Sequence, residues 1–264
     1  MKPPNLRRGI YIIPTLMTML NIFFGFRAII ACTRAVAAIT DGRNDLAIQS
    51  FETACLSLFI AAVFDTFDGL LARALGATSE FGKEYDSIAD VVTFGAAPAV
   101  LVYCWGLRDL RIGAPIAFIF LVAVSLRLAR FNVMAGKTDH RYFVGLPSPA
   151  GALTLASIAF YAPAPVTNER FAMVIVVLTV AVAFAMVSPI RYRSQKGLYF
   201  KRERSLLPIV LIAGVLAIAA KWPREFLFVG SISYLASGPL MKLWSIAFPS
   251  SLPAPEPEPE STHA

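Results

Sequence analysis

The feature that most constrains this chain is a series of long apolar stretches. An α-helix needs about 20 apolar residues to cross the hydrocarbon core of a bilayer. We place stretches of this kind at about residues 10–36, 46–64, 84–107, 114–135, 145–163, 170–190, 206–221 and 225–247. Hydrophobic residues make up 57% of the chain and charged residues only 16%, which is far from the composition of soluble domains. The sequence therefore predicts an all-α polytopic membrane bundle of about eight transmembrane helices, with a core of about six and two added at the C-terminal end.

The apolar stretches and the segments between them divide the chain into five parts. A basic N-terminus (1–9) precedes the main membrane domain (10–190), and a basic loop (191–205) separates that domain from two additional membrane helices (206–247). The tail (248–264) is rich in Pro and Glu, so we expect it to be disordered. No small-residue cleavage site follows a short apolar core near the start, and we interpret the first apolar stretch as a retained helix.

Lys and Arg residues are distributed unevenly between the predicted loops. The segments on the side of the N-terminus carry about twice as many of them as the segments on the opposite side. This bias predicts that both termini face the cytoplasm, in a protein of the inner (cell) membrane. The densest basic run, 191–204, would lie beside anionic membrane lipids. The net charge of +7 therefore needs no nucleic-acid partner.

Four aspartates interrupt the apolar pattern around the second and third predicted helices. Asp65 and Asp68 are three residues apart, so they share one face of a helix, and Asp86 and Asp90, four apart, do the same. Carboxylates at membrane depth are costly and by default mark a function. Without a counter-charge the four would repel one another. One or two divalent cations would remove this repulsion, and oxygen-only ligands favour Mg²⁺, Mn²⁺ or Ca²⁺ over zinc.

Small residues and one arginine accompany the aspartates. Gly69 and Ala72 lie on the face of the first aspartate pair, and Gly82 precedes the second pair. Their lack of bulk would let a ligand approach the backbone. Arg73 offers a planar group that suits a phosphate. Carboxylates, a hard cation, an arginine and clearance together indicate a diphosphate site. A solvated acidic loop would explain two of the aspartates, but not the whole combination.

These residues form a pattern that resembles a known family. The pattern D-x-x-D-G-x-x-A-R-x8-G-x3-D-x3-D, which runs from Asp65 to Asp90, is similar to the signature of the CDP-alcohol phosphatidyltransferases. Four further segments look like the bacterial and archaeal phosphatidylserine synthases of that family: PTLMTMLNIFFGF (14–26), FGKEYDSIADVVTFGAAPA (81–99), LRLARFNV (126–133) and GLPSPAGA (145–152). The resemblance covers roughly residues 10–190.

The resemblance implies a reaction and roles for the aspartates. A CDP-alcohol phosphatidyltransferase of this kind would transfer the phosphatidyl group of CDP-diacylglycerol to the hydroxyl of L-serine, giving phosphatidylserine and CMP. Asp65, Asp68 and Asp86 would hold the divalent cation, with Asp90 shared or close by. By resemblance Asp90 is also the general base for the serine hydroxyl, although spacing alone lets Asp86 and Asp90 exchange roles. The resemblance also implies a homodimer.

Polar residues in the first predicted helix have two interpretations. Thr18 and Asn21 are three residues apart and share a face. Hydrogen bonds between membrane helices would explain them. The resemblance instead favours contacts with the CDP group.

Polar residues near the end of the fourth predicted helix are candidates for binding the acceptor. Arg127 and Arg130 are three residues apart, and Asn132 follows. They could extend to the cytoplasmic interface without further function. Alternatively, a guanidinium would match the carboxylate of serine with two parallel hydrogen bonds. We expect this second role, with Arg130 and Asn132 as the leading serine-binding residues.

Two other functions stay open. The same chemistry could use another acceptor, such as glycerol 3-phosphate, inositol phosphate or choline. A phosphorylated acceptor would require a denser basic site. A cation-coupled transporter or channel could also carry intramembrane aspartates. Against this alternative, the predicted orientation places all four aspartates on one side of the membrane.

Overall fold

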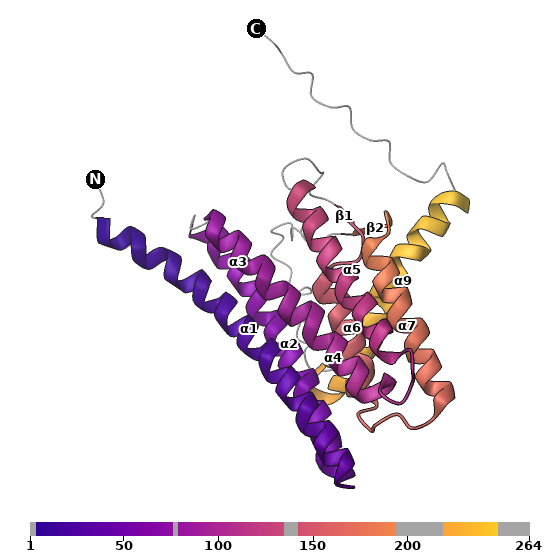
Figure 1. Ribbon diagram of the computed structural model, residues 1–264. Coiled ribbons are helices and arrows are strands. Elements are labelled where there is room, and N and C mark those ends of the chain that lie inside the picture. The colour runs from indigo at the N-terminus through magenta and orange to yellow at the C-terminus, as the bar shows by residue number, and fades with distance from the viewer. Residues whose placement is uncertain (1–3, 76–78, 135–141, 194–218, 248–264) are drawn as a thin grey trace.

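The chain folds as a bundle of long helices, shown by its computed structural model (Figure 1). The structure describes residues 4–75, 79–134, 142–193 and 219–247. The helices are α1 (Pro4–Thr40), α2 (Asn44–Ala74), α3 (Glu80–Asp90), η1 (Val91–Ala96), α4 (Ala97–Val102), η2 (Tyr103–Leu107), α5 (Gly113–Met134), α6 (Ser148–Tyr161), α7 (Glu169–Val187) and α9 (Pro223–Ala247).

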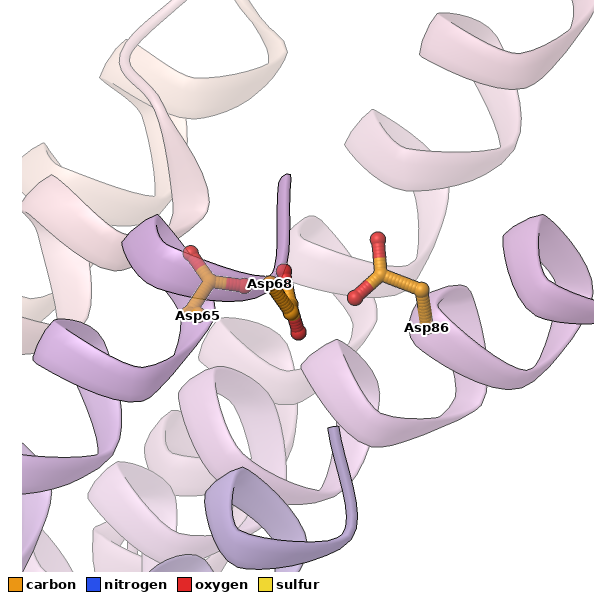
Figure 2. A group of neighbouring side chains, drawn as sticks. All are labelled: Asp65, Asp68 and Asp86. Carbon is orange, nitrogen blue, oxygen red and sulfur yellow. The ribbon is translucent and has the colours of Figure 1, made fainter. Parts of the chain in front are cut away.

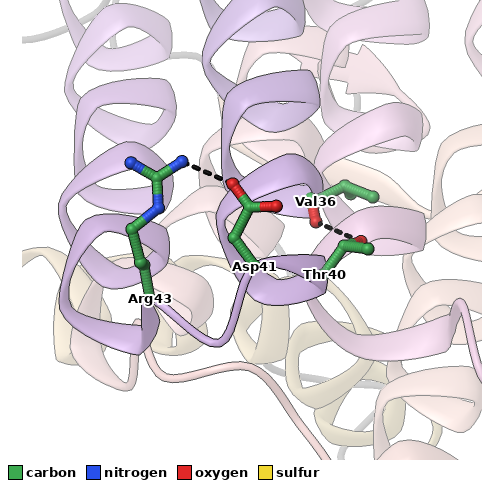
Figure 3. Close-up of polar contacts among 4 residues, drawn as sticks. All are labelled: Val36, Thr40, Asp41 and Arg43. Carbon is green, nitrogen blue, oxygen red and sulfur yellow. Dashed lines mark hydrogen bonds and ion pairs between the residues drawn. The ribbon is translucent and has the colours of Figure 1, made fainter.

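A tight turn joins α1 to α2, which lie side by side in Figure 1. Gly42 has φ of +73° in this turn, a conformation that glycine adopts without steric cost. Next to it Arg43 pairs with Asp41 at 2.5 Å, and the hydroxyl of Thr40 donates to the carbonyl oxygen of Val36 at 3.1 Å (Figure 3). The turn makes α1 and α2 antiparallel, so residues near the start of α1 lie beside residues near the end of α2.

The third long helix of the bundle is continuous and consists of α3, η1, α4 and η2. Its N-cap is Ser79, whose hydroxyl oxygen accepts a hydrogen bond from the N–H of Gly82 at 3.0 Å. Both η1 and η2 are π-helical turns, which are uncommon and often occur at functional sites. Asp90 is the last residue of α3, so the first π-helical turn begins directly after it.

Six helices in the described part of the chain are long and apolar enough to cross a membrane. They span Thr15–Thr40, Asn44–Leu71, Glu80–Leu107, Gly113–Met134, Glu169–Val187 and Pro223–Trp244. The protein is an integral membrane protein, and its predicted all-α class is confirmed. Two short strands are a minor addition: β1 (Tyr142–Val144) follows α5 and pairs antiparallel with β2 (Arg191–Arg193), which follows α7.

The predicted number of eight transmembrane helices is not confirmed. The stretch predicted at 145–163 forms α6, a helix of only 14 residues. About 20 are needed to cross the hydrocarbon core. The stretch predicted at 206–221 lies almost wholly outside the described residues. The other six predicted stretches correspond to the six helices that are long enough.

Small side chains fill the interior where α1 meets α2. Ala28, Cys32 and Ala35 of α1 are buried in the same core as Ala54 and Cys55 of α2. Small residues let membrane helices approach closely, because van der Waals packing rather than the hydrophobic effect drives their association. The close contact of these two helices places their polar residues next to each other.

Large apolar side chains cover the outside of the bundle. Phe23, Phe118, Val177 and Phe184 are among those that are more than half exposed. Extended apolar surface is rare on soluble monomers. It suits a surface that contacts lipid chains, in agreement with the six apolar helices.

The last described helix, α9, packs against this core. The ring of Phe228 stacks on that of Tyr161 in α6, with centroids 4.9 Å apart. Arg224, near the start of α9, forms an ion pair with Glu52 of α2. These contacts hold α9 against α6 and α2.

Candidate active site

Three of the four predicted aspartates form a cluster between α2 and α3. One carboxylate oxygen from each of Asp65, Asp68 and Asp86 lies within 4.8 Å of the others. Figure 2 shows Asp65 and Asp68 on one helix and Asp86 on the other, with its carboxylate directed toward theirs. The spacing within each pair places the carboxylates on facing sides of the two helices, as predicted.

Asp90 lies beside this cluster, one helical turn after Asp86. Its side chain is within hydrogen-bond distance of Asp65. Within the described part of the chain, Oδ1 of Asp90 and Oδ1 of Asp86 are buried and have no hydrogen-bond partner. Unpaired buried oxygens are costly unless a ligand satisfies them. An all-oxygen donor set with unpaired atoms fits a hard divalent cation.

The first helix contributes a third side of the site. The hydroxyl of Thr18 in α1 donates to Oδ2 of Asp68 at 3.2 Å. Asn21 lies one turn further along and is fully buried. Neither its amide nitrogen nor its amide oxygen has a partner among the described residues. A buried amide without partners can donate hydrogen bonds to a ligand and accept them from it.

The predicted diphosphate residues lie at the adjoining ends of α2 and α3. Gly69 follows Asp68 directly in α2. Ala72 and Arg73 belong to the last turn of α2, and their side chains are outside the described part of the structure. Gly82 lies in the first turn of α3, with its N–H bonded to the N-cap hydroxyl. The helix ends therefore bring these backbone positions near the carboxylates.

Arg127 of α5 is the predicted acceptor residue that is buried. It is only 8% exposed, and its Nη1 donates to the hydroxyl oxygen of Ser148 at 2.7 Å. Its Nε is buried and has no partner among the described residues. The guanidinium is close enough to Asp90 for the two charges to attract each other.

The other two acceptor candidates make contacts between helices. Arg130 donates to the carbonyl oxygens of Val187 at 2.9 Å and Met186 at 3.5 Å. A cation is favourable there, because the last carbonyls of α7 have no partner within the helix. Asn132 donates from its amide nitrogen to the hydroxyl oxygen of Ser87 at 2.9 Å, which ties α5 to α3.

Two polar residues beside the site had no role in the sequence analysis. Ser148, the first residue of α6, binds Arg127, and its segment GLPSPAGA carries part of the resemblance. Thr93 lies three residues after Asp90 and donates to the backbone oxygen of Asn21 at 3.2 Å. The i, i+3 spacing from Asp90 was a signal that could have identified Thr93.

The fold and the site define an integral membrane protein with a carboxylate cluster that could bind a metal ion. A family model described as CDP-alcohol phosphatidyltransferase matches residues 11–187. The chain belongs to the CDP-alcohol phosphatidyltransferase family.

Several relatives are similar over most of their length. The CDP-diacylglycerol–serine O-phosphatidyltransferase of Helicobacter pylori is 32% identical over 235 residues, which cover 87% of this chain and 90% of the relative. The protein of the same name from Methanocaldococcus jannaschii is 32% identical over 228 residues, 86% of this chain and 96% of the relative. The archaetidylserine synthase of Methanothermobacter thermautotrophicus is 32% identical over 188 residues, 70% and 71% of the two chains.

Proposed function

We propose that this protein transfers the phosphatidyl group of CDP-diacylglycerol to the hydroxyl of L-serine, giving phosphatidylserine and CMP. The observation that carries the proposal is the carboxylate cluster of α2 and α3, in a chain whose relatives bear the name of this enzyme over most of their length. The archaetidylserine synthase relative also carries serine in the name of its product.

Asp65, Asp68 and Asp86 would hold the divalent cation, with Asp90 shared or close by. Oxygen-only ligands favour Mg²⁺ or Mn²⁺, and Ca²⁺ also fits; the four carboxylates have capacity for one or two ions. When bound there, a divalent cation neutralises charge on the diphosphate and makes CMP a better leaving group.

The nucleotide and its diphosphate would lie between α1 and the adjoining ends of α2 and α3. Asn21 supplies an amide with free donors and an acceptor, while Thr18 keeps Asp68 in place. The small residues Gly69, Ala72 and Gly82 leave room for the diphosphate near the backbone. Arg73 would donate hydrogen bonds to its phosphate oxygens.

Asp90 would act as general base on the acceptor. The oxygen of the serine hydroxyl forms a bond to the β-phosphorus as its proton passes to Asp90. The bond between that phosphorus and the bridging oxygen breaks, and CMP leaves with the electron pair. Because Oδ1 of Asp90 is buried, water would have little access to the proton transfer.

Arg127 is the residue we assign to the carboxylate of serine. Its guanidinium is buried and has an unpaired Nε among the described atoms. An arginine fork binds a carboxylate with two parallel hydrogen bonds. Arg130 and Asn132 remain proposed serine-binding residues, and their contacts with α7 and α3 would hold this side of the site in place.

The wider setting follows from the sequence. The site would face the cytoplasm, with both termini on the same side, in the inner (cell) membrane. The main membrane domain would extend from 10 to 190. Anionic lipids would contact the basic loop at 191–205, and the family resemblance supports a homodimer.

The proposal is tested by CMP release from CDP-diacylglycerol by the purified protein with Mg²⁺ or Mn²⁺. Serine, glycerol 3-phosphate, inositol phosphate and choline are each offered as the acceptor, with Asp90→Asn as the inactive control. Release that depends on serine and is lost in the variant supports the proposal. CMP release that depends on a different acceptor would support the phosphatidyl transfer but reject serine as the acceptor. Ion flux in liposomes without CMP release would favour a transporter.

A further inference from the structure

The first helix crosses the π-helical turn η1 at unusually short range. A Cβ atom built on Gly25 would lie 2.5 Å from Oγ1 and 2.9 Å from Cα of Thr93. Both distances are too short for any residue larger than glycine without movement of the backbone. The backbones of α1 and η1 are therefore in direct contact at Gly25 and Thr93.

A hydrogen bond reinforces this crossing. Thr93 is fully buried, and its hydroxyl donates to the carbonyl oxygen of Asn21 at 3.2 Å. Asn21 lies one helical turn before Gly25, so both contacts act on the same turn of α1. Together they fix this turn relative to η1 in position and in rotation.

Groups of the candidate site lie on both sides of the crossing. On α1, the side chain of Asn21 is buried with both polar atoms unpaired in the described part of the chain. On the helix formed by α3 and η1, Asp90 precedes Thr93 by three residues. Its Oδ1 is buried and has no partner among the described residues. A change in the crossing would move the Asn21 amide relative to the Asp90 carboxylate.

We propose that Thr93 is a positioning residue for the phosphatidyl transfer. Its hydroxyl, held against α1 at Gly25, fixes the turn of α1 that carries Asn21, so that the Asn21 amide reaches the CDP group of the CDP-diacylglycerol bound beside Asp90. This inference rests on the proposed function. The plain alternative is a hydrogen bond that joins two membrane helices and contributes to stability alone.

Two substitutions at this position and one matched control separate the alternatives. Thr93→Val keeps the shape of the side chain and removes the hydroxyl, and Thr93→Ser restores it. The control is Thr179→Val, because Thr179 is also buried but donates to the carbonyl oxygen of Ile175 within α7. For each purified variant we would measure kcat, the KM values for CDP-diacylglycerol and serine, and the Kd of CDP with Mg²⁺ by calorimetry.

We expect Thr93→Val to raise the KM for CDP-diacylglycerol and the Kd of CDP about fivefold to tenfold, as for loss of one buried hydrogen bond. The KM for serine should not change, Thr93→Ser should restore most of the CDP affinity, and Thr179→Val should match the wild-type protein. If the hydrogen bond from Thr93 to Asn21 contributes to stability alone, its loss would instead lower the fraction of folded protein. That outcome would reduce kcat with both KM values and the CDP Kd unchanged, and it would overturn the proposal.

The CDP measurement also separates this inference from the proposed function. If the wild-type protein binds CDP but releases no CMP with any acceptor, the proposed function fails. The comparison of CDP affinity between Thr93→Val and Thr93→Ser still decides whether Thr93 positions the nucleotide site. Equal affinity in all variants would reject the positioning role whatever the reaction.

Discussion

The hydroxyl of Thr18 in α1 donates a hydrogen bond to Oδ2 of Asp68 in α2 at 3.2 Å. This contact joins the first helix to the carboxylate cluster. A partner that orients a metal ligand commonly contributes 10-fold to 100-fold to metal affinity. Thr18 therefore has a role through Asp68 that can be measured separately from catalysis.

Thr18→Val should weaken metal binding. Loss of the hydroxyl leaves Asp68 free to rotate away from the cluster, so we expect the Mg²⁺ concentration for half-maximal CMP release to rise about tenfold. Thr18→Ser should retain most of the affinity. The control is Thr33→Val in the same helix, because the exposed Thr33 donates only to the carbonyl oxygen of Ile30. An unchanged metal requirement in Thr18→Val would show that Asp68 does not need this partner.

Removal of the metal should abolish activity reversibly. We expect EDTA to stop CMP release and to weaken CDP binding, and excess Mg²⁺ or Mn²⁺ to restore both. Asp86→Asn keeps the shape of the side chain but removes its charge, and should reduce kcat/KM about 100-fold or more. Asp109→Asn is the control, because Asp109 is exposed and pairs with Arg108 away from the cluster. Full activity in EDTA would contradict a metal role for these aspartates.

Substitution of Arg127 should affect serine more than the lipid substrate. Arg127→Lys keeps the charge but loses the planar fork, so we expect the KM for serine to rise about 10-fold to 100-fold. The KM for CDP-diacylglycerol should stay near its wild-type value. Ser148→Ala removes the partner of Arg127 and should give a smaller change in the same direction. Equal effects on both substrates would argue against a role in acceptor binding.

Gly42→Ala should destabilise the turn between α1 and α2. No atom lies within 4 Å of the added methyl group, so the cost comes only from the positive φ and should be about 1 kcal/mol in the free energy of unfolding. Gly230→Ala is the matched control, because it also has open space around it but lies inside α9. We expect that substitution to be neutral or stabilising. Thermal unfolding in detergent compares the two, and equal shifts would contradict this account of the turn.

Much of the site was predictable from the sequence, because charged residues in an apolar context are costly. The spacing of the four aspartates gave the two helix faces, and the structure brings three of the carboxylates together. Thr18 and Asn21 were identified by the same reasoning, since polar residues stand out in a membrane helix. The six longest helices were predictable for a related reason, because a minimum apolar length is needed to cross the bilayer.

Contacts between residues far apart in the chain were not predictable. The bond from Thr93 to Asn21 and the bond from Arg127 to Ser148 depend on how helices are arranged, and no local pattern encodes that arrangement. The two interpretations of Arg130 and Asn132 could not be separated for the same reason. The short α6 was mistaken for a full span because its flanking loop residues are also apolar.

The family-model match at residues 11–187 agrees with the predicted range, and the similarity to individual relatives extends further. The motifs in the sequence support a resemblance over roughly residues 10–190. The matches of 235 and 228 residues are longer than this range and must include part of the C-terminal region. The motifs that carry the resemblance all lie in the first part of the chain. Similarity in the C-terminal region that is not concentrated in a motif could therefore not be recognised from them. The packing of α9 on α6 and its ion pair with α2 agree with a C-terminal region that belongs to the same unit.

The most direct test of the central claim follows an oxygen atom. Serine labelled with ¹⁸O in its hydroxyl is incubated with CDP-diacylglycerol, Mg²⁺ and the purified protein, and the lipid product and CMP are analysed by mass spectrometry. Direct attack of the serine hydroxyl on the β-phosphorus places the label in phosphatidylserine and none in CMP. Absence of a labelled lipid product, with the protein folded and able to bind CDP, would contradict the proposed transfer to serine.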